Sequence, residues 1–441
     1  MTTSRNADPG AELAKQKSVP GLLLRQIAAA RLAEVLKGAS FAPFSASEIA
    51  EGRDRAVANR LVTTALRHHG AIDAAIAKLL ERGMPKKSGS FESVLRLSLA
   101  QLLFLPELGD HSALFLAGEA MRADVRSQHL GKLMNAVLRR AQAEADDLRS
   151  GGTPFPKQRM DKWRKIYGDD ALDAFAAALF EGAPLDLTLK DSDPTLLTAL
   201  GGQTIIADSV RVMERDSTVE QLPGFSEGRF WVQDVAAALP ARLIDLPQGA
   251  RVLDLCAAPG GKTAQLIKAG YTVTALDSDG VRMERLAQNL KRLNYSAETI
   301  TADVLGYAPA ALFDGVLLDA PCSATGIFRR HPEVVWHRDA SDIAGRAALQ
   351  RRFIARGAQM LRPGGTLVYC VCSLEPEEGE EQVPFIIDQG LEPMPVSAAE
   401  LGGWKAPITP AGFVRTHPGL TLPGGMAGRL DGFFVARFRR R

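Results

Sequence analysis

A turn, an apolar run and two thiols follow one another in Arg362-Pro363-Gly364-Gly365-Thr366-Leu367-Val368-Tyr369-Cys370-Val371-Cys372-Ser373. This order predicts a buried strand with thiols at its carboxyl end. A second apolar run, residues 315–318, leads into Asp319-Ala320-Pro321-Cys322-Ser323. Ligands of open α/β sheets bind outside the carboxyl ends of the strands. Two strand ends that each carry a thiol therefore indicate a site that uses both Cys322 and Cys372.

Length and composition set the class of protein. The chain has 441 residues, 46% of them hydrophobic and 24% charged, and its formal net charge is +2. These values are ordinary for a globular protein and leave room for two or three domains. The first 150 residues hold a small excess of basic side chains, which suits RNA binding and a solvated helical surface about equally.

The cysteines and the apolar runs indicate the compartment. Four cysteines are too few for a disulfide scaffold in a chain of this length. Residues 1–20 show no secretory signal, and no apolar run approaches the roughly 18 residues of a membrane span. We expect a cytoplasmic protein that does not contact a membrane, and we expect it to be a monomer.

Hydrophobic periodicity divides the chain into parts. Helical spacing runs through the first third, whereas apolar strands and helices alternate from about residue 246, as in a doubly wound α/β domain. The predicted parts are a disordered tail (1–19), an all-α bundle (20–148), a Gly- and Pro-rich linker (149–156), a small mixed α/β RNA-binding subdomain (157–235) and a seven-stranded α/β domain (236–441).

The sequence also predicts individual elements. In the bundle we expect helices near 24–36, 61–80, 91–105, 113–122 and 130–148. In the α/β domain we expect strands at 251–255, 271–276, 297–301, 313–318, 366–371 and 432–438. Helices are expected at 264–269, 281–293 and 341–361, and in the subdomain a helix at 169–180 and a strand at 185–190.

The loop after the first of these strands, Cys256-Ala257-Ala258-Pro259-Gly260-Gly261-Lys262, opens a helix. Free N–H groups at a helix start favour an anion, and this loop fits the carboxylate of an amino-acid cofactor better than a pyrophosphate. Asp277 at the next strand end suits ribose hydroxyls. Asp303, one strand further, suits an adenine amino group. These features together predict S-adenosylmethionine, with Asp319 as a further contact, although any single Asp here can instead cap a helix or form a turn.

The two thiols suit methylation of a pyrimidine. C5 of cytosine becomes nucleophilic after a thiolate adds to C6, and a base must then remove the C5 proton so that the thiol leaves. Lys262 is a candidate source of the positive charge that favours a thiolate. Cys370 and Cys372 form a Cys-x-Cys pair, but no second ligand pair is near in sequence, so we expect no metal.

Basic residues surround Trp163 in the segment 157–165. Such a segment can follow a nucleic-acid backbone and stack on a base. It can also be a helix surface with Trp163 anchored in the core, which we favour slightly.

Two resemblances to known families extend this interpretation. Residues 130–140, Leu-Gly-Lys-Leu-Met-Asn-Ala-Val-Leu-Arg-Arg, resemble the closing helix of the NusB-like RNA-binding domain, and residues 113–122 resemble the helix before it. From about residue 157 to the end, the chain resembles the RNA cytosine-5 methyltransferases of the Sun/Fmu type. The motifs that carry this resemblance are Cys256–Thr263, Asp319–Gly326, Arg329–Glu333, Leu349-Gln350, Leu361–Ser373 and Asp431–Phe434.

The resemblance implies a Rossmann-like methyltransferase domain that uses S-adenosylmethionine. It implies Cys372 as the nucleophile and Cys322 as the thiol that helps release the product. It assigns cofactor binding to Cys256, Ala257, Ala258, Pro259, Gly260, Gly261, Lys262, Asp277, Asp303 and Asp319.

The substrate that the resemblance implies is 16S ribosomal RNA, free or in a partly assembled small subunit. Three alternatives stay open. The same chemistry can act on tRNA, or the chain can be an RNA-binding ribosome assembly factor with vestigial methyl transfer. A nicotinamide-dependent enzyme is a distant third.

Overall fold

The computed structural model describes residues 19–213, 218–426 and 428–441. Residues 1–18 of the predicted tail lie outside this description. The chain divides into two compact units, Met1–Lys157 and Gln158–Arg441. The finer division into a linker (149–156) and an RNA-binding subdomain (157–235) stays a prediction.

The described part of the first unit is built from helices, as the sequence predicts. Its α-helices are α2 (Leu22–Val35), α3 (Gly52–Arg67), α4 (His69–Leu79), α5 (Phe91–Phe104), α6 (Asp110–Ala123), α7 (Gly131–Ala143) and α8 (Ala145–Arg149). Helix α5 contacts α2, α3, α6, α7 and α8, and its Leu95 and Leu99 are fully buried. It is therefore the central helix of the bundle.

One helix of the bundle differs from its prediction. The sequence suggests a single helix over 130–148, but the structure ends α7 at Ala143 and starts α8 at Ala145. Glu144 between them has φ −105° and ψ 17°, outside the helical region. Its carboxylate accepts from Arg140 Nε at 2.9 Å and pairs with Lys78 Nζ at 2.9 Å. Both pairs are partly exposed, and an apolar pattern that continues through Glu144 does not reveal the break.

The second unit contains two sheets. Helices α9 (Lys157–Tyr167), α10 (Asp169–Glu181) and α11 (Pro194–Ala199) accompany a four-stranded antiparallel sheet of order β2-β3-β1-β4. Its strands are β1 (Leu185–Leu189), β2 (Gly202–Ile206), β3 (Ser209–Val212) and β4 (Phe230–Val232). The sequence predicted β1 but not β2, β3 and β4. Burial does not alternate along β2, and β3 buries the polar Ser209 and Arg211, so neither strand shows the alternation of buried and exposed residues on which such a prediction depends.

The larger sheet has eight strands, seven of them in the continuous order β10-β12-β9-β8-β5-β6-β7, with β11 paired to β12. The strands are β5 (Arg251–Leu255), β6 (Thr272–Asp277), β7 (Glu298–Thr301), β8 (Phe313–Asp319), β9 (Leu361–Val371), β10 (Leu391–Pro393), β11 (Val414–Thr416) and β12 (Phe433–Arg440). Strands β5 to β9 pair in parallel, and β12 runs antiparallel to β9. The predicted Rossmann-like α/β fold is therefore confirmed, with an antiparallel edge added.

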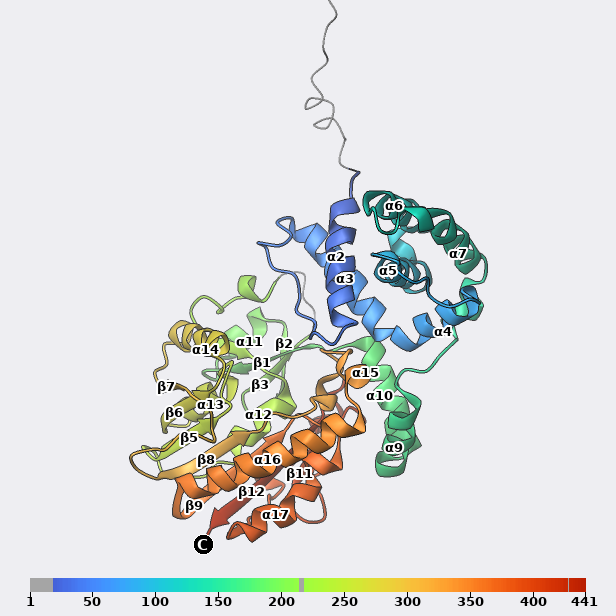
Figure 1. The fold of residues 1–441 in the computed structure, drawn as a ribbon. Coiled ribbons are helices and arrows are strands. Elements are labelled where there is room, and N and C mark those ends of the chain that lie inside the picture. The colour runs from blue at the N-terminus through green and yellow to red at the C-terminus, as the bar shows by residue number, and fades with distance from the viewer. Residues whose placement is uncertain (1–18, 214–217, 427) are drawn as a thin grey trace, which may run out of the picture. The chain divides into compact units, whose positions relative to one another are not determined.

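Helices cover both faces of this sheet (Figure 1). Successive strand residues point to opposite faces. On one face, Val316 and Leu318 pack with α16 (Ala340–Met360) and α17 (Val383–Asp388). On the other face, Leu317 packs with α12 (Val235–Arg242) and α13 (Gly261–Lys268). Helix α14 (Gly280–Arg292) packs beside α13. Burial on both faces explains why these strands read as continuous apolar runs.

Two further observations concern the described residues only. None of their helices combines the length and apolar character that a membrane crossing requires. No group of three or more His, Cys, Asp or Glu side chains among them is arranged to hold a metal ion.

A buried ion pair joins β1 to β3 of the small sheet. Asp186 lies opposite Arg211, and the guanidinium donates to both carboxylate oxygens, Nε to Oδ1 at 2.7 Å and Nη2 to Oδ2 at 2.9 Å. Asp186 is fully buried and Arg211 is 3% exposed. A buried charge that loses its partner is costly because the low-dielectric interior cannot solvate it.

We expect Asp186→Ala to lower the free energy of unfolding of the second unit by about 3–5 kcal/mol. All four tryptophans lie in this unit, so urea unfolding followed by tryptophan fluorescence reports on it alone. The matched control is Asp161→Ala, which removes a half-exposed ion pair to Arg164 and should cost less than about 1 kcal/mol. Equal losses in the two variants would contradict the role given to the buried pair.

Candidate functional site

The predicted site residues gather where parallel strands end. Strands β9, β8, β5 and β6 are neighbours in this order, and their carboxyl ends lie at one edge of the sheet. The pairing of β8 with β9 sets Asp319 opposite Cys370. The chain segments that continue from these two positions carry Cys322 and Cys372. The alignment of the strand ends thus brings residues 50 positions apart in the chain into one site.

The two predicted thiols are in contact. Cys322 Sγ and Cys372 Sγ lie 3.4 Å apart, and both side chains are partly exposed. Gly326 N–H donates to the Cys372 carbonyl at 3.0 Å, which joins the two loops through their backbones as well. The hydrogen bond to Cys372 and burial raise the pKa of Cys322 well above its ordinary value. Cys322 is therefore a neutral thiol that can donate to Cys372.

Lys262 and Asp319 form an ion pair beside the thiols. Lys262 Nζ lies 2.7 Å from Asp319 Oδ2, and Cys370 Sγ lies 3.5 Å from Asp319 Oδ1. Burial lowers the pKa of Lys262, but the charge and hydrogen bond of Asp319, with contributions from Cys370 and Cys372, together outweigh it, so the net shift is upward. Lys262 consequently carries its positive charge at neutral pH, within electrostatic range of Cys372.

The first loop folds back onto Asp277, which is 3% exposed at the end of β6. Ala258 N–H donates to Asp277 Oδ2 at 3.2 Å, and Asp279 N–H donates to Asp277 Oδ1 at 3.0 Å. A carboxylate has about four acceptor positions, so capacity for ribose hydroxyls remains. Asp303, two residues after β7, is exposed and accepts from Leu305 N–H at 2.9 Å. No described contact joins Asp303 to the other site residues.

Asp254 is a buried carboxyl that the sequence did not single out. It lies on β5, between the strands that carry Asp277 and Asp319, and its Oδ2 accepts from Thr263 Oγ1 at 2.6 Å. Among the described residues, its Oδ1 has no hydrogen-bond partner. Burial raises the pKa of Asp254 to about 7, against the hydrogen bond from Thr263, with the charges of Asp319 and Asp277 adding to the rise.

Glu378 is a second residue that sequence reasoning missed. It is fully buried, and donors from both thiol loops converge on it. Ser323 N–H donates to Oε1 at 2.8 Å, Ser373 Oγ donates to Oε2 at 2.5 Å, and Ser323 Oγ also donates to Oε2. Gln350 Nε2 on α16 donates to Oε1 at 3.1 Å. Since Ser323 follows Cys322 and Ser373 follows Cys372, Glu378 ties the two cysteine loops together.

We name Glu378, Ser323, Ser373 and Gln350 the Glu378 cluster. The only signal for it in the sequence is the acidic run Glu375-Pro376-Glu377-Glu378 directly after the thiols. An acidic run most often predicts a solvated surface, and nothing in the run distinguishes the buried Glu378 from its neighbours.

Helix α9 supports the same loop. Arg159 Nη1 donates to Glu375 at 2.6 Å, and Lys162 Nζ donates to Glu375 at 2.5 Å and to Glu377 at 2.8 Å. Trp163 is fully buried against Phe175 and Phe328, so the core alternative for this tryptophan is confirmed. Arg159 and Lys162, two basic residues of the segment 157–165 that could have contacted nucleic acid, therefore hold the loop after Cys372.

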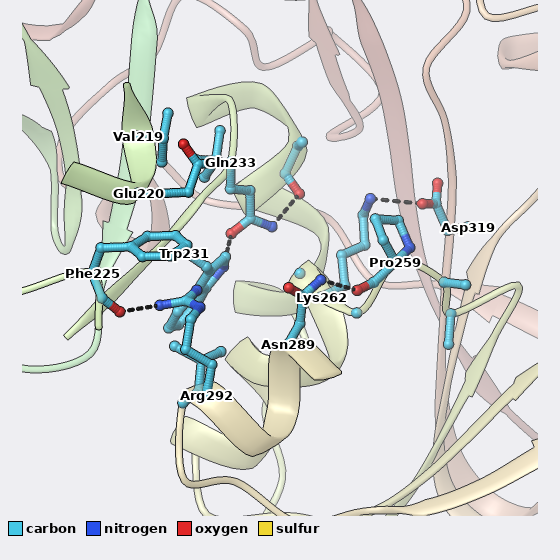
Figure 2. Close-up of a pocket in the computed structure, with 17 residues that line it drawn as sticks. Val219, Glu220, Phe225, Trp231, Gln233, Pro259, Lys262, Asn289, Arg292 and Asp319 are labelled. Carbon is cyan, nitrogen blue, oxygen red and sulfur yellow. Dashed lines mark hydrogen bonds and ion pairs between the residues drawn. The ribbon is translucent and has the colours of Figure 1, made fainter. Parts of the chain in front are cut away.

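The first loop, residues 257–262, lines a cavity of about 540 Å³ (Figure 2). Lys262 and Asp319 lie at one end, and Phe225 and Arg292 lie at the other (Figure 2). The remaining lining residues are Val219, Glu220, Trp231, Val232, Gln233, Ala237, Ala257, Ala258, Pro259, Gly260, Gly261, Asn289 and Leu293. Asp277, Asp303 and the two thiols are not among them.

The residues at the strand ends fit the predicted cofactor. S-adenosylmethionine has a sulfonium and an ammonium group, and Asp277 and Asp319, at the ends of β6 and β8, carry the matching negative charge. Free N–H groups at the start of α13, after Gly260, suit its carboxylate. Asp277 retains acceptor capacity for its ribose.

Known protein families match both the helical first unit and the α/β domain of the second unit. A sequence model of the NusB family matches residues 23–143, and one described as 16S rRNA methyltransferase RsmB/F matches residues 241–439. The ribosomal RNA small subunit methyltransferase B of Xanthomonas campestris pv. campestris is 36% identical over 406 residues, covering 88% of this chain and 89% of the relative. That of Pseudomonas putida is 34% identical over 445 residues, covering 93% and 97%.

Solved structures give the same fold. The crystal structure of PH0851 superposes with a TM-score of 0.75 at 21% identity, covering 97% of this chain and all of that one. A methyltransferase homologue from Pyrococcus horikoshii superposes with a TM-score of 0.54 at 27% identity, covering 65% of this chain and 96% of that one. The chain therefore belongs to the ribosomal RNA small subunit methyltransferase B family and is an S-adenosylmethionine-dependent methyltransferase.

Proposed function

We propose that the protein methylates C5 of a cytosine in 16S ribosomal RNA through a covalent bond between Cys372 Sγ and C6 of the base. The observation that carries this proposal is the pair of thiols in contact at 3.4 Å, at the ends of two neighbouring strands and beside a charged lysine. The names of the relatives support ribosomal RNA as the substrate. The base must leave any stack to reach Cys372, which favours an unpaired position.

The first step needs a thiolate. An ordinary cysteine, of pKa about 8.5, is only slightly ionised at neutral pH. Cys322 can donate a hydrogen bond to the Cys372 sulfur across 3.4 Å, and the ammonium of Lys262 lies within electrostatic range of Cys372. Addition of the Cys372 thiolate to C6 forms the S–C6 bond and moves an electron pair of the C5=C6 bond to C5.

Bound S-adenosylmethionine would supply the electrophilic methyl group that C5 attacks, so that its S–CH₃ bond would break as the C5–CH₃ bond forms. In our proposal, Asp277 and the loop 256–262 hold this cofactor. Asp319 orients Lys262 toward the reacting base and cofactor through the ion pair at 2.7 Å.

Cys322 then promotes release of the product. The hydrogen bond and the negative charge of Cys372 raise the pKa of Cys322. Both causes disappear when Cys372 becomes a thioether, while burial remains. Cys322, which is partly exposed, then releases its own proton to solvent, and the resulting thiolate accepts the C5 proton. The C5=C6 bond re-forms, and Cys372 leaves as a thiolate.

The Glu378 cluster positions both thiols for these steps. Its hydrogen bonds reach the residue after each cysteine, so displacement of Glu378 would move both sulfur atoms at once. Catalysis by a nucleophile and a base on one substrate carbon pair depends on their separation.

Mapping of 5-methylcytosine tests the proposal and the role of Cys372. We expect cells that lack the protein to lose one 5-methylcytosine of 16S rRNA, measured by bisulfite sequencing. The wild-type gene should restore it, and Cys372→Ala should not, because no S–C6 bond can form. In the purified variant, binding of S-adenosylmethionine measured by calorimetry should be unchanged.

Other outcomes of this mapping contradict the proposal in identifiable ways. A mark lost from tRNA would retain the chemistry and change the substrate. An unchanged mark with defective subunit assembly would favour the assembly factor. Methylation by Cys372→Ala would exclude Cys372 as the nucleophile.

We expect Cys322→Ala to accumulate a covalent enzyme–RNA adduct, because addition and methyl transfer proceed while proton removal stalls. The adduct would appear as a slower band after denaturing electrophoresis with labelled 16S rRNA. Replacing Cys372 as well should abolish the band. The thiol control is Cys370→Ala, which removes a buried sulfur and should form no stable adduct. A Cys322→Ala enzyme that turns over freely would disprove the two-thiol scheme.

We expect Glu378→Leu to lower kcat by about 100-fold, the cost of displacing a catalytic group by about 1 Å. Glu378→Gln keeps the size and can accept from Ser323 N–H, so its loss should be about tenfold or less. Binding of S-adenosylmethionine should be unchanged in both variants.

The matched control is Glu381→Gln, a nearby exposed glutamate that should keep wild-type activity. Tryptophan fluorescence would verify that the variants are folded. Wild-type kcat in folded Glu378→Leu would show that the thiol loops hold their positions without Glu378.

A further inference from the structure

We propose that the cavity behind the first loop binds the RNA nucleotide next to the target cytosine, with its base stacked on the guanidinium of Arg292. This inference rests on the proposed function, since it assigns a further part of the same RNA. The cavity volume of about 540 Å³ is within the range of small-molecule sites and is ample for one nucleotide.

Its position identifies the nucleotide. Lys262 and Asp319 form the wall nearest the thiols, but Cys322 and Cys372 themselves do not line the cavity. The target base must contact Cys372, so it lies outside this space. A nucleotide adjoining the target base is the part of the substrate that can enter past Lys262.

The cofactor is a poorer occupant. Asp277 and Asp303, the carboxylates that suit ribose and adenine, do not line the cavity. The loop 257–262 thus has two sides, one toward Asp277 and the cofactor and one toward the cavity. An RNA strand that reaches Cys372 can continue along the second side while the cofactor occupies the first.

Arg292 provides a preorganised stacking surface. Its guanidinium lies over the Phe225 ring, 4.2 Å from the ring centroid. Nη1 donates to the Phe225 carbonyl at 2.9 Å and Nη2 to the Phe230 carbonyl at 3.0 Å. These bonds fix the guanidinium plane before any ligand arrives. Arginine planes held in this way are common stacking partners of unpaired RNA bases.

Two amide side chains line the cavity, and they differ in their capacity to hydrogen-bond a ligand. Gln233 accepts from Thr188 and Trp231 and donates to Gln265, so its amide has little capacity for a ligand. Asn289 donates to the Pro259 carbonyl at 3.0 Å through Nδ2. Among the described residues, its Oδ1 has no hydrogen-bond partner, and it can accept from the amino group of a base.

The test measures RNA affinity in a full-length Arg292→Lys enzyme. Lysine keeps the positive charge and so the attraction to phosphates, but it lacks the planar group. We expect the dissociation constant for a 16S rRNA transcript to rise about tenfold, the size of one lost base stack. The dissociation constant for S-adenosylmethionine should stay unchanged.

Arg285→Lys is the matched control, because Arg285 is exposed on the same helix and lies outside the cavity. It should bind the transcript like the wild type. Phe225→Leu keeps apolar volume beneath the guanidinium without the ring, and should weaken RNA binding as well. This second variant keeps the test decisive if Arg292→Lys does not fold, which tryptophan fluorescence would show.

Two results would overturn the inference. Wild-type RNA affinity in the folded variants would exclude stacking in the cavity. Weaker binding of S-adenosylmethionine with unchanged RNA affinity would assign the cavity to the cofactor. Failure of the proposed function looks different: the wild-type enzyme would form no 5-methylcytosine, while the comparison of dissociation constants would still decide whether the cavity binds RNA.

Discussion

The parallel pairing of β8 with β9 is the constraint on which the candidate site depends. It sets Asp319 opposite Cys370, and the two thiols follow at short, fixed distances along each chain. A shift of this register by one residue would turn Val316, Leu317 and Leu318 to the wrong faces of the sheet. The packing of α16 on one face and α12 on the other resists such a shift. The hydrophobic core therefore fixes the positions of the thiols.

Buried charged residues hold the loop that follows β9 in place. The loop that carries Cys372 has no strand partner, and Glu378, Glu375 and Arg415 hold it from different sides. Arg415 is 7% exposed and donates to the Ser373 carbonyl, while Arg159 of α9 pairs with Glu375. Buried ion pairs add little net stability but strongly disfavour arrangements that leave a charge unpaired. Such a network suits a loop that must keep one geometry.

The sequence was sufficient for what depends on local pattern. Strand β5 has its predicted limits, and α16 is displaced by one residue, because buried apolar runs and long helices give strong periodic signals. The pairing of Cys322 with Cys372 was also expected, from two thiols at strand ends. Side-chain contacts between residues far apart in the chain could not be predicted from the sequence. Glu378 reads as one of several acidic residues, and its partners Ser323 and Gln350 lie 55 and 28 positions away along the chain.

Four thiols lie in the second unit, and their surroundings separate them. Burial, with the charges of Asp319 and Asp277 adding to it, raises the pKa of Cys256, and burial together with Asp319 raises that of Cys370. Both are thus held as neutral thiols and are poor nucleophiles. The carboxylates that suit a cationic cofactor thus add to the effect of burial in keeping Cys256 and Cys370 protonated. Cys322 differs, because the largest cause of its raised pKa is the hydrogen bond to Cys372, with burial second. In the proposed reaction this hydrogen bond is lost when Cys372 Sγ bonds to C6 of the base, so the surroundings of Cys322 change at the step that releases the product, whereas those of Cys256 and Cys370 do not.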